Sequence, residues 1–387
     1  MKILIINRYM SVYGGAENVV KELSESFNSS GNHAAVIALN ISDEVRKLCG
    51  NTRMIVPQKQ FGYEFRSTGF FASLGMLGEI LAMRKLVKAN AKDFDVLNPH
   101  NFPAYWATFG LKKPVVWMCN EPPDLWHNPK PSLALKLTRF FGILLDKLFV
   151  SAVDKVITAD DLNAGRVKER YGRDSAIVPY GIDQDIFLKS EYGRKELGAE
   201  YGIPASDFIL LQVGVLSPQK NQLDTVKALK ALLDSGLKAK LLLAGKDDLP
   251  YAAKVKEYIS ANNLKDRVIF TGQLAKVKIA GLYRSADLCV FPVKEQGGWL
   301  APFEALFCKT PVIVSSSMGA ADLIKKLDFG IVSDNLNADV VETAKNYDKY
   351  KKKAVIASIW VKSNLNWGRF SKDILNICRE TADKYKR

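Results

Sequence analysis

One stretch of the sequence combines a glycine-rich loop with an acidic residue on the helix that follows it. The stretch, residues 291–306, begins where an apolar strand is predicted to end at Phe291. Gly297 and Gly298 lie in the loop, and Glu304 falls within the first turns of a predicted helix. Backbone N–H groups of such a loop can bind phosphate and sugar oxygens, and a carboxylate can accept hydrogen bonds from hydroxyl groups. Glu304 could instead only complement the helix dipole, but its apolar neighbours favour a partly buried, functional carboxylate.

A second candidate site lies where the opening strand of the second half of the chain ends. That strand runs to Gly214, and Pro218 is predicted to start a helix with Lys220 in its first turn. A lysine beside the positive end of a helix can hold a diphosphate, although most lysines at such positions are simply solvated. Near the N-terminus, Gly14 and Gly15 stand between a strand and a helix, where they could let the backbone approach a phosphate or could form an ordinary turn.

The three histidines do not have the spacing of a metal site. His33 precedes a strand and is predicted to be structural. His100 follows a strand at its carboxyl end, where it could face a ligand, and His127 lies in a loop after residues 121–126. We expect no metal site, and we expect the adjacent acidic pair at 247–248 to lie in a solvated loop.

The elements that must position these residues alternate along the chain. Short, unbroken apolar runs are separated by stretches of helical period, which is typical of parallel sheets covered by helices on both faces. The alternation pauses between residues 185 and 206, in a polar, glycine-containing stretch. We therefore predict an α/β protein of two Rossmann-like domains, with ligands bound at the carboxyl ends of the strands. The predicted strands are residues 3–6, 35–39, 53–56, 95–97, 115–118, 155–158, 176–178, 208–213, 240–244, 268–270, 288–291, 312–314 and 330–332.

Composition and charge narrow the class of function. The chain has 387 residues, of which 48% are hydrophobic and 25% charged, and this is typical of a globular protein rather than of a disordered or collagenous one. Its 55 Lys and Arg against 41 Asp and Glu give a net charge of +14, which should attract phosphates, acidic glycans or anionic lipid. We recognise no signal peptide and no apolar run of about 18 residues. The five cysteines lack disulfide or zinc spacing, so we expect a cytoplasmic location.

Taken in order, these motifs resemble the retaining glycosyltransferases of family 4, which have the GT-B fold. The resemblance extends over nearly the whole chain, and it is carried by residues 14–17, 154–159, 177–183, 214–220, 291–304, 310–313 and 366–370. It implies two Rossmann-like doubly wound domains facing each other across a cleft. The acceptor domain is expected at residues 1–188, completed by a C-terminal helix at 366–387. The donor domain is expected at residues 189–365.

The resemblance also implies a reaction and a set of site residues. A sugar would move, with retention of its anomeric configuration, from a UDP- or GDP-sugar to a glycan or lipid-linked acceptor, with no obligatory metal or other cofactor. The implied catalytic residues are Lys220, Glu295, Gln296 and Glu304. The implied donor-binding residues are Gly14, Gly15, Gly214, Lys220, Gly297, Gly298, Trp299, Leu300 and Glu304. The acceptor-side candidates are His100, Asn120, Glu121 and His127.

Three positions depart from the family pattern. Val215 stands where the family usually has an arginine, so the phosphate lysine must act with less help or a cation elsewhere must supply the charge. Gln296 stands where the family has the first of two glutamates. We expect Glu295 and Gln296 to line the sugar pocket together, with Glu304 on the ribose. Asn120 stands where a histidine is usual. These departures are also compatible with a degenerate, inactive transferase.

Two segments of the first half, residues 70–88 and 133–150, mix apolar and basic side chains. Each could be a surface helix that attracts anionic lipid, or a core helix with solvated lysines. We favour a lipid-linked acceptor at the inner membrane face, in polysaccharide or glycolipid synthesis, with the protein peripheral to the membrane. The sequence is also compatible with a nucleotide-sugar epimerase of the same architecture, which needs no acceptor, and with a non-catalytic binder of anions or nucleic acid. The dispersed basic residues argue against nucleic acid as a partner.

Overall fold

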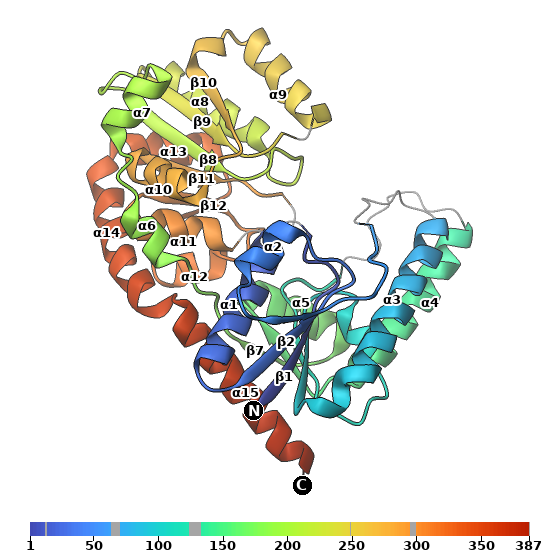
Figure 1. Cartoon of the computed structure of the whole chain (residues 1–387). Coiled ribbons are helices and arrows are strands. Elements are labelled where there is room, and N and C mark those ends of the chain that lie inside the picture. The colour runs from blue at the N-terminus through green and yellow to red at the C-terminus, as the bar shows by residue number, and fades with distance from the viewer. Residues whose placement is uncertain (12–13, 63–69, 124–132, 248, 295–298, 387) are drawn as a thin grey trace. The chain divides into compact units, whose positions relative to one another are not determined.

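The protein is described here from a computed structural model, which covers the chain except residues 12–13, 63–69, 124–132, 248, 295–298 and 387. It divides into two compact units (Figure 1). Unit 1 consists of Met1–Pro179 and Trp367–Arg387, and unit 2 of Tyr180–Asn366. Each unit is an α/β structure around its own parallel sheet.

The first boundary between the units lies after Pro179, not after residue 188 as predicted from the sequence. The reason is the packing of α6 (Gln184–Lys189), which contacts α10 (Lys276–Ser285) of unit 2. The ring of Phe187 on α6 is buried, and its centroid lies 6.1 Å from that of Tyr283 on α10. Apolar burial of α6 therefore fixes this segment to unit 2.

The sheet of unit 1 is parallel throughout its named strands. Its strands lie in the order β3-β2-β1-β4 and β5-β6-β7, and bridges such as Leu97–Val115 join β4 to β5. The sheet is therefore continuous, and the carboxyl ends of β1, β4 and β5 are neighbours. The strands are β1 (Lys2–Ile6), β2 (His33–Ile37), β3 (Arg53–Ile55), β4 (Val96–Pro99), β5 (Val116–Met118), β6 (Lys155–Thr158) and β7 (Ser175–Ile177).

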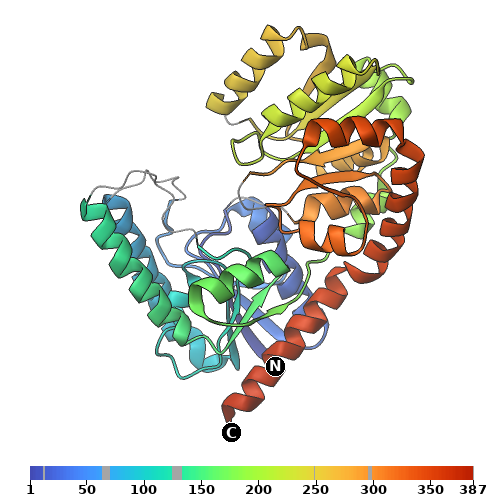
Figure 2. The ribbon, with the colours of Figure 1, turned by 180° about the vertical axis from the view of Figure 1, so that it is seen from behind.

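Helices bury the apolar side chains of this sheet. Leu4 and Ile6 of β1 share one core with Met83 and Val87 of α3. Helices α1 and α15 pack against each other, and Figure 2 shows α15 running along unit 1 to the C-terminus. The helices are α1 (Gly15–Ser29), α2 (Asp43–Leu48), α3 (Phe70–Asn90), η1 (Ala91–Asp93), η2 (Ala104–Thr108), α4 (Leu133–Ser151), α5 (Asp161–Tyr171) and α15 (Trp367–Lys386).

A buried carboxylate ties three helices of unit 1 together. Asp146 on α4 accepts hydrogen bonds from the hydroxyl of Tyr105 and from the indole of Trp106 at 3.0 Å, both on η2. It also accepts one from the hydroxyl of Tyr171 on α5 at 2.7 Å, and the guanidinium of Arg170 lies 3.3 Å away. Because a buried charge is tolerated only when its hydrogen bonds are made, we assign Asp146 to the framework rather than to a site.

The sheet of unit 2 has the strand order of a Rossmann domain. Its parallel strands lie in the order β10-β9-β8-β11-β12-β13, so the direction of winding reverses between β8 and β11, where such sheets bind ligands. The strands are β8 (Phe208–Val213), β9 (Ala239–Ala244), β10 (Val268–Gly272), β11 (Leu288–Phe291), β12 (Val312–Ser315) and β13 (Ile331–Ser333).

The core of unit 2 is aliphatic. Leu210 of β8, Leu241 of β9 and Val290 of β11 are buried against Leu229 of α8 and other helical residues. The helices not yet named are α7 (Arg194–Tyr201), α8 (Gln222–Asp234), α9 (Leu249–Ala261), η3 (Lys265–Arg267), α11 (Leu300–Phe307), α12 (Ala321–Lys326), α13 (Leu336–Lys345) and α14 (Tyr347–Asn364). Within the described part of the chain, every helix is too short or too polar to cross a membrane.

Candidate functional site

Three glycines stand where neighbouring strands of unit 2 end. Gly214 follows β8, Gly245 follows β9, and Gly272 closes β10. The N–H of Gly214 donates to the carbonyl of Ala244 at 2.8 Å, and the N–H of Gly245 donates to the carbonyl of Gly272 at 3.0 Å. A Cβ atom on Gly245 would lie only 2.0 Å from the carbonyl oxygen of Gly214. The absence of side chains therefore lets these loops pack closely at the edge of the sheet where its strands end.

We expect Gly245→Ala to destabilise unit 2 strongly, because the new methyl group would overlap the backbone at Gly214. Either the β8 loop moves or the contact is lost, at a cost of about 3 kcal/mol or more. Urea unfolding measures the loss. Gly165→Ala is the control, because its Cβ would meet nothing within 4 Å in helix α5. An unchanged unfolding midpoint for Gly245→Ala would show that the close approach is not needed.

Lys220 lies in the turn after β8, and its side chain passes over Gly214. A Cβ at Gly214 would stand 3.9 Å from both Cγ and Cδ of Lys220. The carbonyl of Lys220 accepts a hydrogen bond from the buried amide of Gln212 at 2.7 Å, and Thr225 of α8 in turn donates to Gln212 at 2.6 Å. Because these partners are buried, the backbone at Lys220 is held in one place.

The predicted start of a helix at Pro218 was wrong. Residues 218–221 form a turn, and α8 begins at Gln222 after Asn221, which has the left-handed φ of 57°. The buried amide of Gln222 closes the turn, because its oxygen accepts from the N–H of Ser217 at 3.2 Å. Lys220 therefore precedes the helix by two residues instead of lying in its first turn.

The turn that carries Lys220 is hydrogen-bonded to the start of the glycine-rich loop. The amide of Asn221 donates to the carbonyl of Pro292 at 3.1 Å. The N–H of Lys294 donates to the carbonyl of Gln219 at 2.9 Å. The loops after β8 and β11 are therefore one connected structure, so the two motifs singled out in the sequence lie at the same edge of the sheet.

Glu304 lies on α11, which follows this loop. Its carboxylate oxygen Oε2 accepts a hydrogen bond from the hydroxyl of the buried Tyr283 at 3.2 Å. Nearby, the ammonium of Lys276 pairs with the carboxylate of Asp183. Burial raises the pKa of Glu304 to about 7; the charge of Lys276 opposes this rise, the charge of Asp183 adds to it, and the Tyr283 hydrogen bond opposes it.

Aromatic packing fixes the start of α11. Trp299 is buried just before the helix, with its ring centroid 4.4 Å from that of Phe303 and 5.5 Å from that of Tyr180. Its indole N–H has no hydrogen-bond partner among the described residues. Leu300 is the first residue of the helix and is half-buried. The candidates Glu295, Gln296, Gly297 and Gly298 lie outside the described residues.

In unit 1 the glycine loop forms a helix start. Gly14 precedes α1, and its N–H donates to the Glu17 carboxylate at 3.2 Å. Gly14 and Gly15 are both exposed. Burial raises the pKa of Glu17, and backbone hydrogen bonds from Glu17 and Gly14 oppose the rise. The negative side chain thus occupies one N–H group of the helix start.

The other candidates in unit 1 follow neighbouring strands of its sheet. His100 follows β4 and is 1% exposed, so it does not present its ring at the surface. Its Nε2 lies 2.9 Å from Asn98 Oδ1, and burial lowers its pKa to about 3, so the ring is neutral. Asn120 and Glu121 follow β5 and are half-buried. His127 lies outside the described residues.

Two Asp-x-Asp triplets, 93–95 and 183–185, were not considered in the sequence analysis. The carboxylate of Asp95 accepts from the backbone N–H of Lys2 at 2.8 Å, and that of Asp183 pairs with Lys276. Across the described ranges, no three His, Cys, Asp or Glu side chains gather as metal ligands would.

The sequence analysis also missed the residues around Glu304. Tyr283 and Lys276 stand on α10, far from the motif of Glu304 in the sequence. Asp183 was noted only as part of a matching segment. No spacing rule links these residues, because their proximity arises from the packing of α10 against α11 and α6.

Two family descriptions match the chain, one mainly in unit 1 and the other in unit 2. Residues 13–186 match the family described as Glycosyltransferase Family 4. Residues 193–352 match the family described as Glycosyl transferases group 1. Together they include the Lys220 turn, the glycine-rich loop and α11 in unit 2, and the start of α1 in unit 1.

Individual proteins similar to this chain point to the same family. The chain is 25% identical over 340 residues to a GDP-mannose-dependent alpha-(1-6)-phosphatidylinositol dimannoside mannosyltransferase of Mycobacterium tuberculosis, a match that covers 86% of this chain and 83% of that one. It is 30% identical over 204 residues to the alpha-monoglucosyldiacylglycerol synthase of Streptococcus pneumoniae, covering 52% of this chain and 44% of that one. The structure of HepE from Anabaena in complex with UDP has a TM-score of 0.78 at 18% identity, over 98% of this chain and 100% of that one. The chain belongs to the family 4 glycosyltransferases and has their GT-B fold.

Proposed function

We propose that this enzyme transfers a glycosyl group, with retention of configuration, from a UDP- or GDP-sugar to a lipid-linked or glycan acceptor. The observation that supports the donor class is the connected structure in unit 2. The Lys220 turn is held by buried amides and is hydrogen-bonded to the loop that leads to Glu304. A cation suited to a diphosphate and a carboxylate suited to ribose hydroxyls thus stand on one edge of the sheet.

The proposed chemistry breaks the bond between the anomeric carbon and the β-phosphate oxygen. The nucleoside diphosphate leaves with that electron pair, and positive charge develops on the sugar. The acceptor hydroxyl attacks from the same face and passes its proton to the departing phosphate. Lys220 and the backbone N–H groups at the strand ends stabilise the negative charge of the leaving group. The protein itself need not supply a base.

The position of Val215 raises the question of a second cation. Its side chain is 52% exposed after β8 and carries no charge. Lys294, joined by its backbone to the Lys220 turn, is exposed and lies 4.0 Å from the carboxylate of Asp224. We propose that Lys294 supplies part of the charge that an arginine at position 215 would give.

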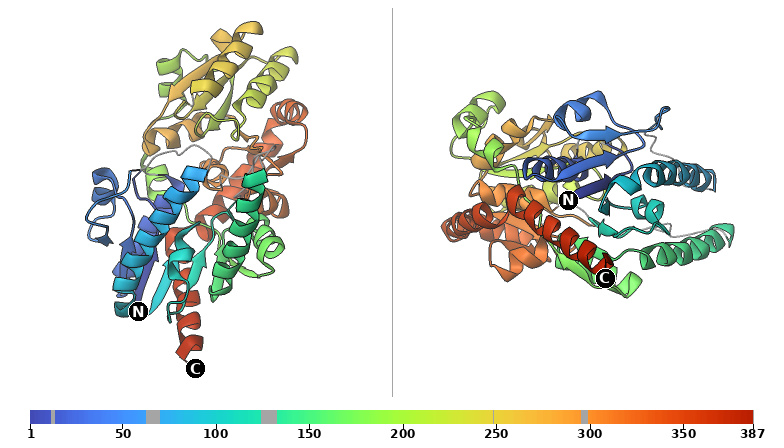
Figure 3. Two further views of the ribbon diagram at one scale, coloured as in Figure 1. Left: turned by 90° about the vertical axis from the view of Figure 1, so that its right-hand side faces the viewer. Right: turned by 60° about the horizontal axis from the view of Figure 1, so that its bottom comes forward.

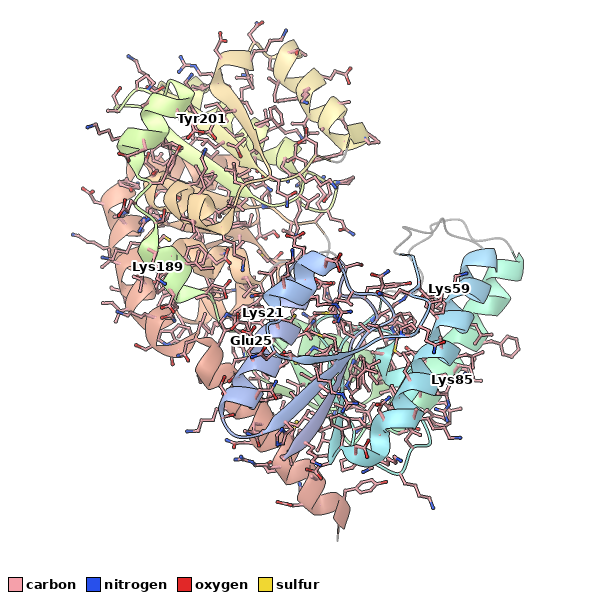
Figure 4. All side chains as sticks on the ribbon, viewed as in Figure 1. Lys21, Glu25, Lys59, Lys85, Lys189 and Tyr201 are labelled. Carbon is pink, nitrogen blue, oxygen red and sulfur yellow. The ribbon has the colours of Figure 1, made fainter. Side chains whose placement is uncertain are left out.

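For the acceptor, we propose a lipid-linked molecule at an anionic membrane. Two relatives carry a lipid in their names, phosphatidylinositol dimannoside in one and monoglucosyldiacylglycerol in the other. Helices α3 and α4 lie at the same side of unit 1 (Figure 3) and leave large apolar side chains exposed. These are Leu77, Leu81, Phe141, Leu144, Leu145 and Leu148. Figure 4 shows Lys85 of α3 pointing outward, and Lys88 and Lys147 are also exposed, so cations accompany the apolar face.

We expect the double variant Leu144→Glu/Leu148→Glu to lose membrane binding. The two leucines are 57% and 50% exposed on α4, and placing carboxylates among anionic lipids removes apolar contact and adds repulsion. Flotation with vesicles of phosphatidylcholine and phosphatidylglycerol should show partitioning reduced about tenfold or more. The control is Leu188→Glu, whose leucine is 59% exposed on α6 of unit 2. If the unmodified protein does not float with these vesicles, the membrane proposal is wrong.

The reaction itself is tested in two steps. A panel of UDP-, GDP- and ADP-sugars is screened for a rise in melting temperature, since a bound ligand stabilises the native state. The stabilising donor is then incubated with lipid-linked and glycan acceptors, and NMR identifies the anomer formed. Inversion would refute retention. Conversion of the donor without any acceptor would favour the epimerase, and donor binding without turnover would favour an inactive transferase.

A further inference from the structure

We propose that Tyr283 is a positioning residue for donor binding: its hydroxyl holds one oxygen of Glu304 and leaves the other to the ribose hydroxyls of the nucleotide. The inference rests on the proposed function, in which Glu304 contacts the ribose. The hydroxyl of Tyr283 donates to Oε2 of Glu304 at 3.2 Å. Among the described residues this is the one hydrogen bond of the Glu304 carboxylate, so Oε1 is available to a hydroxyl donor.

Tyr283 is itself held firmly. Its side chain is fully buried on α10, among the largest such side chains of the protein. The hydroxyl of Thr310 donates to the carbonyl of Tyr283 at 2.5 Å, and the ring of Phe187 lies 6.1 Å away. A buried ring cannot change rotamer without opening a cavity. The position of the hydroxyl is therefore set by the fold, and it sets the orientation of the carboxylate.

The charges around Glu304 make this orientation sensitive to pH. Lys276 and Asp183 form an ion pair near the carboxylate of Glu304. The charge of Glu304 in turn contributes to the raised pKa of Cys308, which follows α11. With the pKa of Glu304 raised to about 7 by burial, the carboxyl loses its proton only near neutral pH. The Tyr283 hydrogen bond lowers this pKa, because it stabilises the charged form. Loss of the hydroxyl should therefore weaken ribose binding most where the carboxyl would become protonated.

The test is the affinity of Tyr283→Phe for UDP and for GDP, measured by calorimetry from pH 6 to pH 9. We expect the affinity to fall about tenfold near pH 6.5 and about threefold or less at pH 9, the range of one hydrogen bond to a charged group. In a Glu304→Gln background, Tyr283→Phe should change the affinity by less than about twofold. Against 2′,3′-dideoxy nucleotides, Tyr283→Phe should bind as well as the unmodified protein.

The control is Tyr192→Phe, which removes another tyrosine hydroxyl that donates to a carboxylate in unit 2, that of Glu200 at 2.8 Å. We expect its nucleotide affinity to follow the unmodified protein at every pH. If the unmodified protein binds neither UDP nor GDP, the proposed function fails and this inference with it. If it binds one of them, the inference is overturned when Tyr283→Phe binds equally well, or when its loss is the same at all pH values and for dideoxy nucleotides.

Discussion

Lys220→Ala should lower kcat/KM for the donor by about 10³-fold, with the fold intact. The ammonium stands on a turn whose backbone is fixed by Gln212 and Thr225, so little energy is spent on ordering that turn when the diphosphate charge develops. Removal of one preorganised donor to a developing anion typically costs about 10²–10³ in kcat. Weaker donor binding raises KM as well, so kcat/KM falls further than kcat. Steady-state kinetics with the donor found by thermal shift measures the effect.

The matched control for this lysine lies on the next helix. Lys230 of α8 pairs with Asp234 at 2.6 Å on the exposed surface, and we expect Lys230→Ala to keep kcat/KM within about twofold, because exposed ion pairs contribute little. Circular dichroism should show both variants folded. Full activity in Lys220→Ala would remove the lysine from the mechanism and leave the charge to other groups. Lys294→Ala then becomes the informative variant, since its backbone is joined to the same turn.

The strands were the best-predicted part of the fold. Every strand of the structure overlaps an apolar run noted in the sequence, and residues 208–213 and 288–291 have the same bounds as β8 and β11. The reason is physical: strands buried on both faces need apolar side chains at every position. Such runs are recognised without knowledge of their partners. The order of the strands in each sheet could not be read in this way.

Local backbone conformation was predicted less well. Pro218 has the type expected at a helix start, but Asn221 adopts a left-handed φ and the helix begins after it. That choice is made by long-range contacts, since the Asn221 amide reaches the carbonyl of Pro292. The unit boundary was misplaced for the same reason, because Phe187 is buried by residues distant in sequence. Polarity alone therefore marks a boundary only approximately.

The sequence indicated individual motifs of the candidate site but not how their residues are arranged in space. The sequence drew attention to Lys220 and Glu304, and the structure joins their loops on one sheet edge. It did not reveal Tyr283, because a tyrosine inside a helix usually indicates only a core residue. His100 could not be judged either, since its burial depends on how neighbouring strands close over it. Side chains that contact a motif residue from a distant part of the sequence can therefore be identified only once the packing is known.

Glu304→Gln should stabilise the protein at alkaline pH relative to acidic pH. The pKa of Glu304 is about 7 in the folded state, raised by burial from its ordinary value of 4.5. A carboxyl whose folded pKa is raised adds stability when protonated, and this stability is lost as the pH rises from 4.5 through 7. Glutamine stays neutral throughout. The difference in unfolding free energy, variant minus unmodified, should therefore rise by about 2–3 kcal/mol between pH 5 and pH 8.

Urea unfolding at pH 5, 6, 7 and 8 measures this difference. The control is Glu342→Gln on the exposed surface of α13. We expect its difference in unfolding free energy from the unmodified protein to change little over the same pH range. The same Glu304→Gln protein should bind nucleotide more weakly than the unmodified protein at pH 8, because the amide accepts hydroxyl hydrogen bonds less strongly than a carboxylate. If one variant is more stable and binds nucleotide more weakly, the partly buried charge of Glu304 costs folding stability and is retained for ligand binding. A difference that stays flat with pH would instead mean that water reaches the carboxylate and that burial does not perturb it.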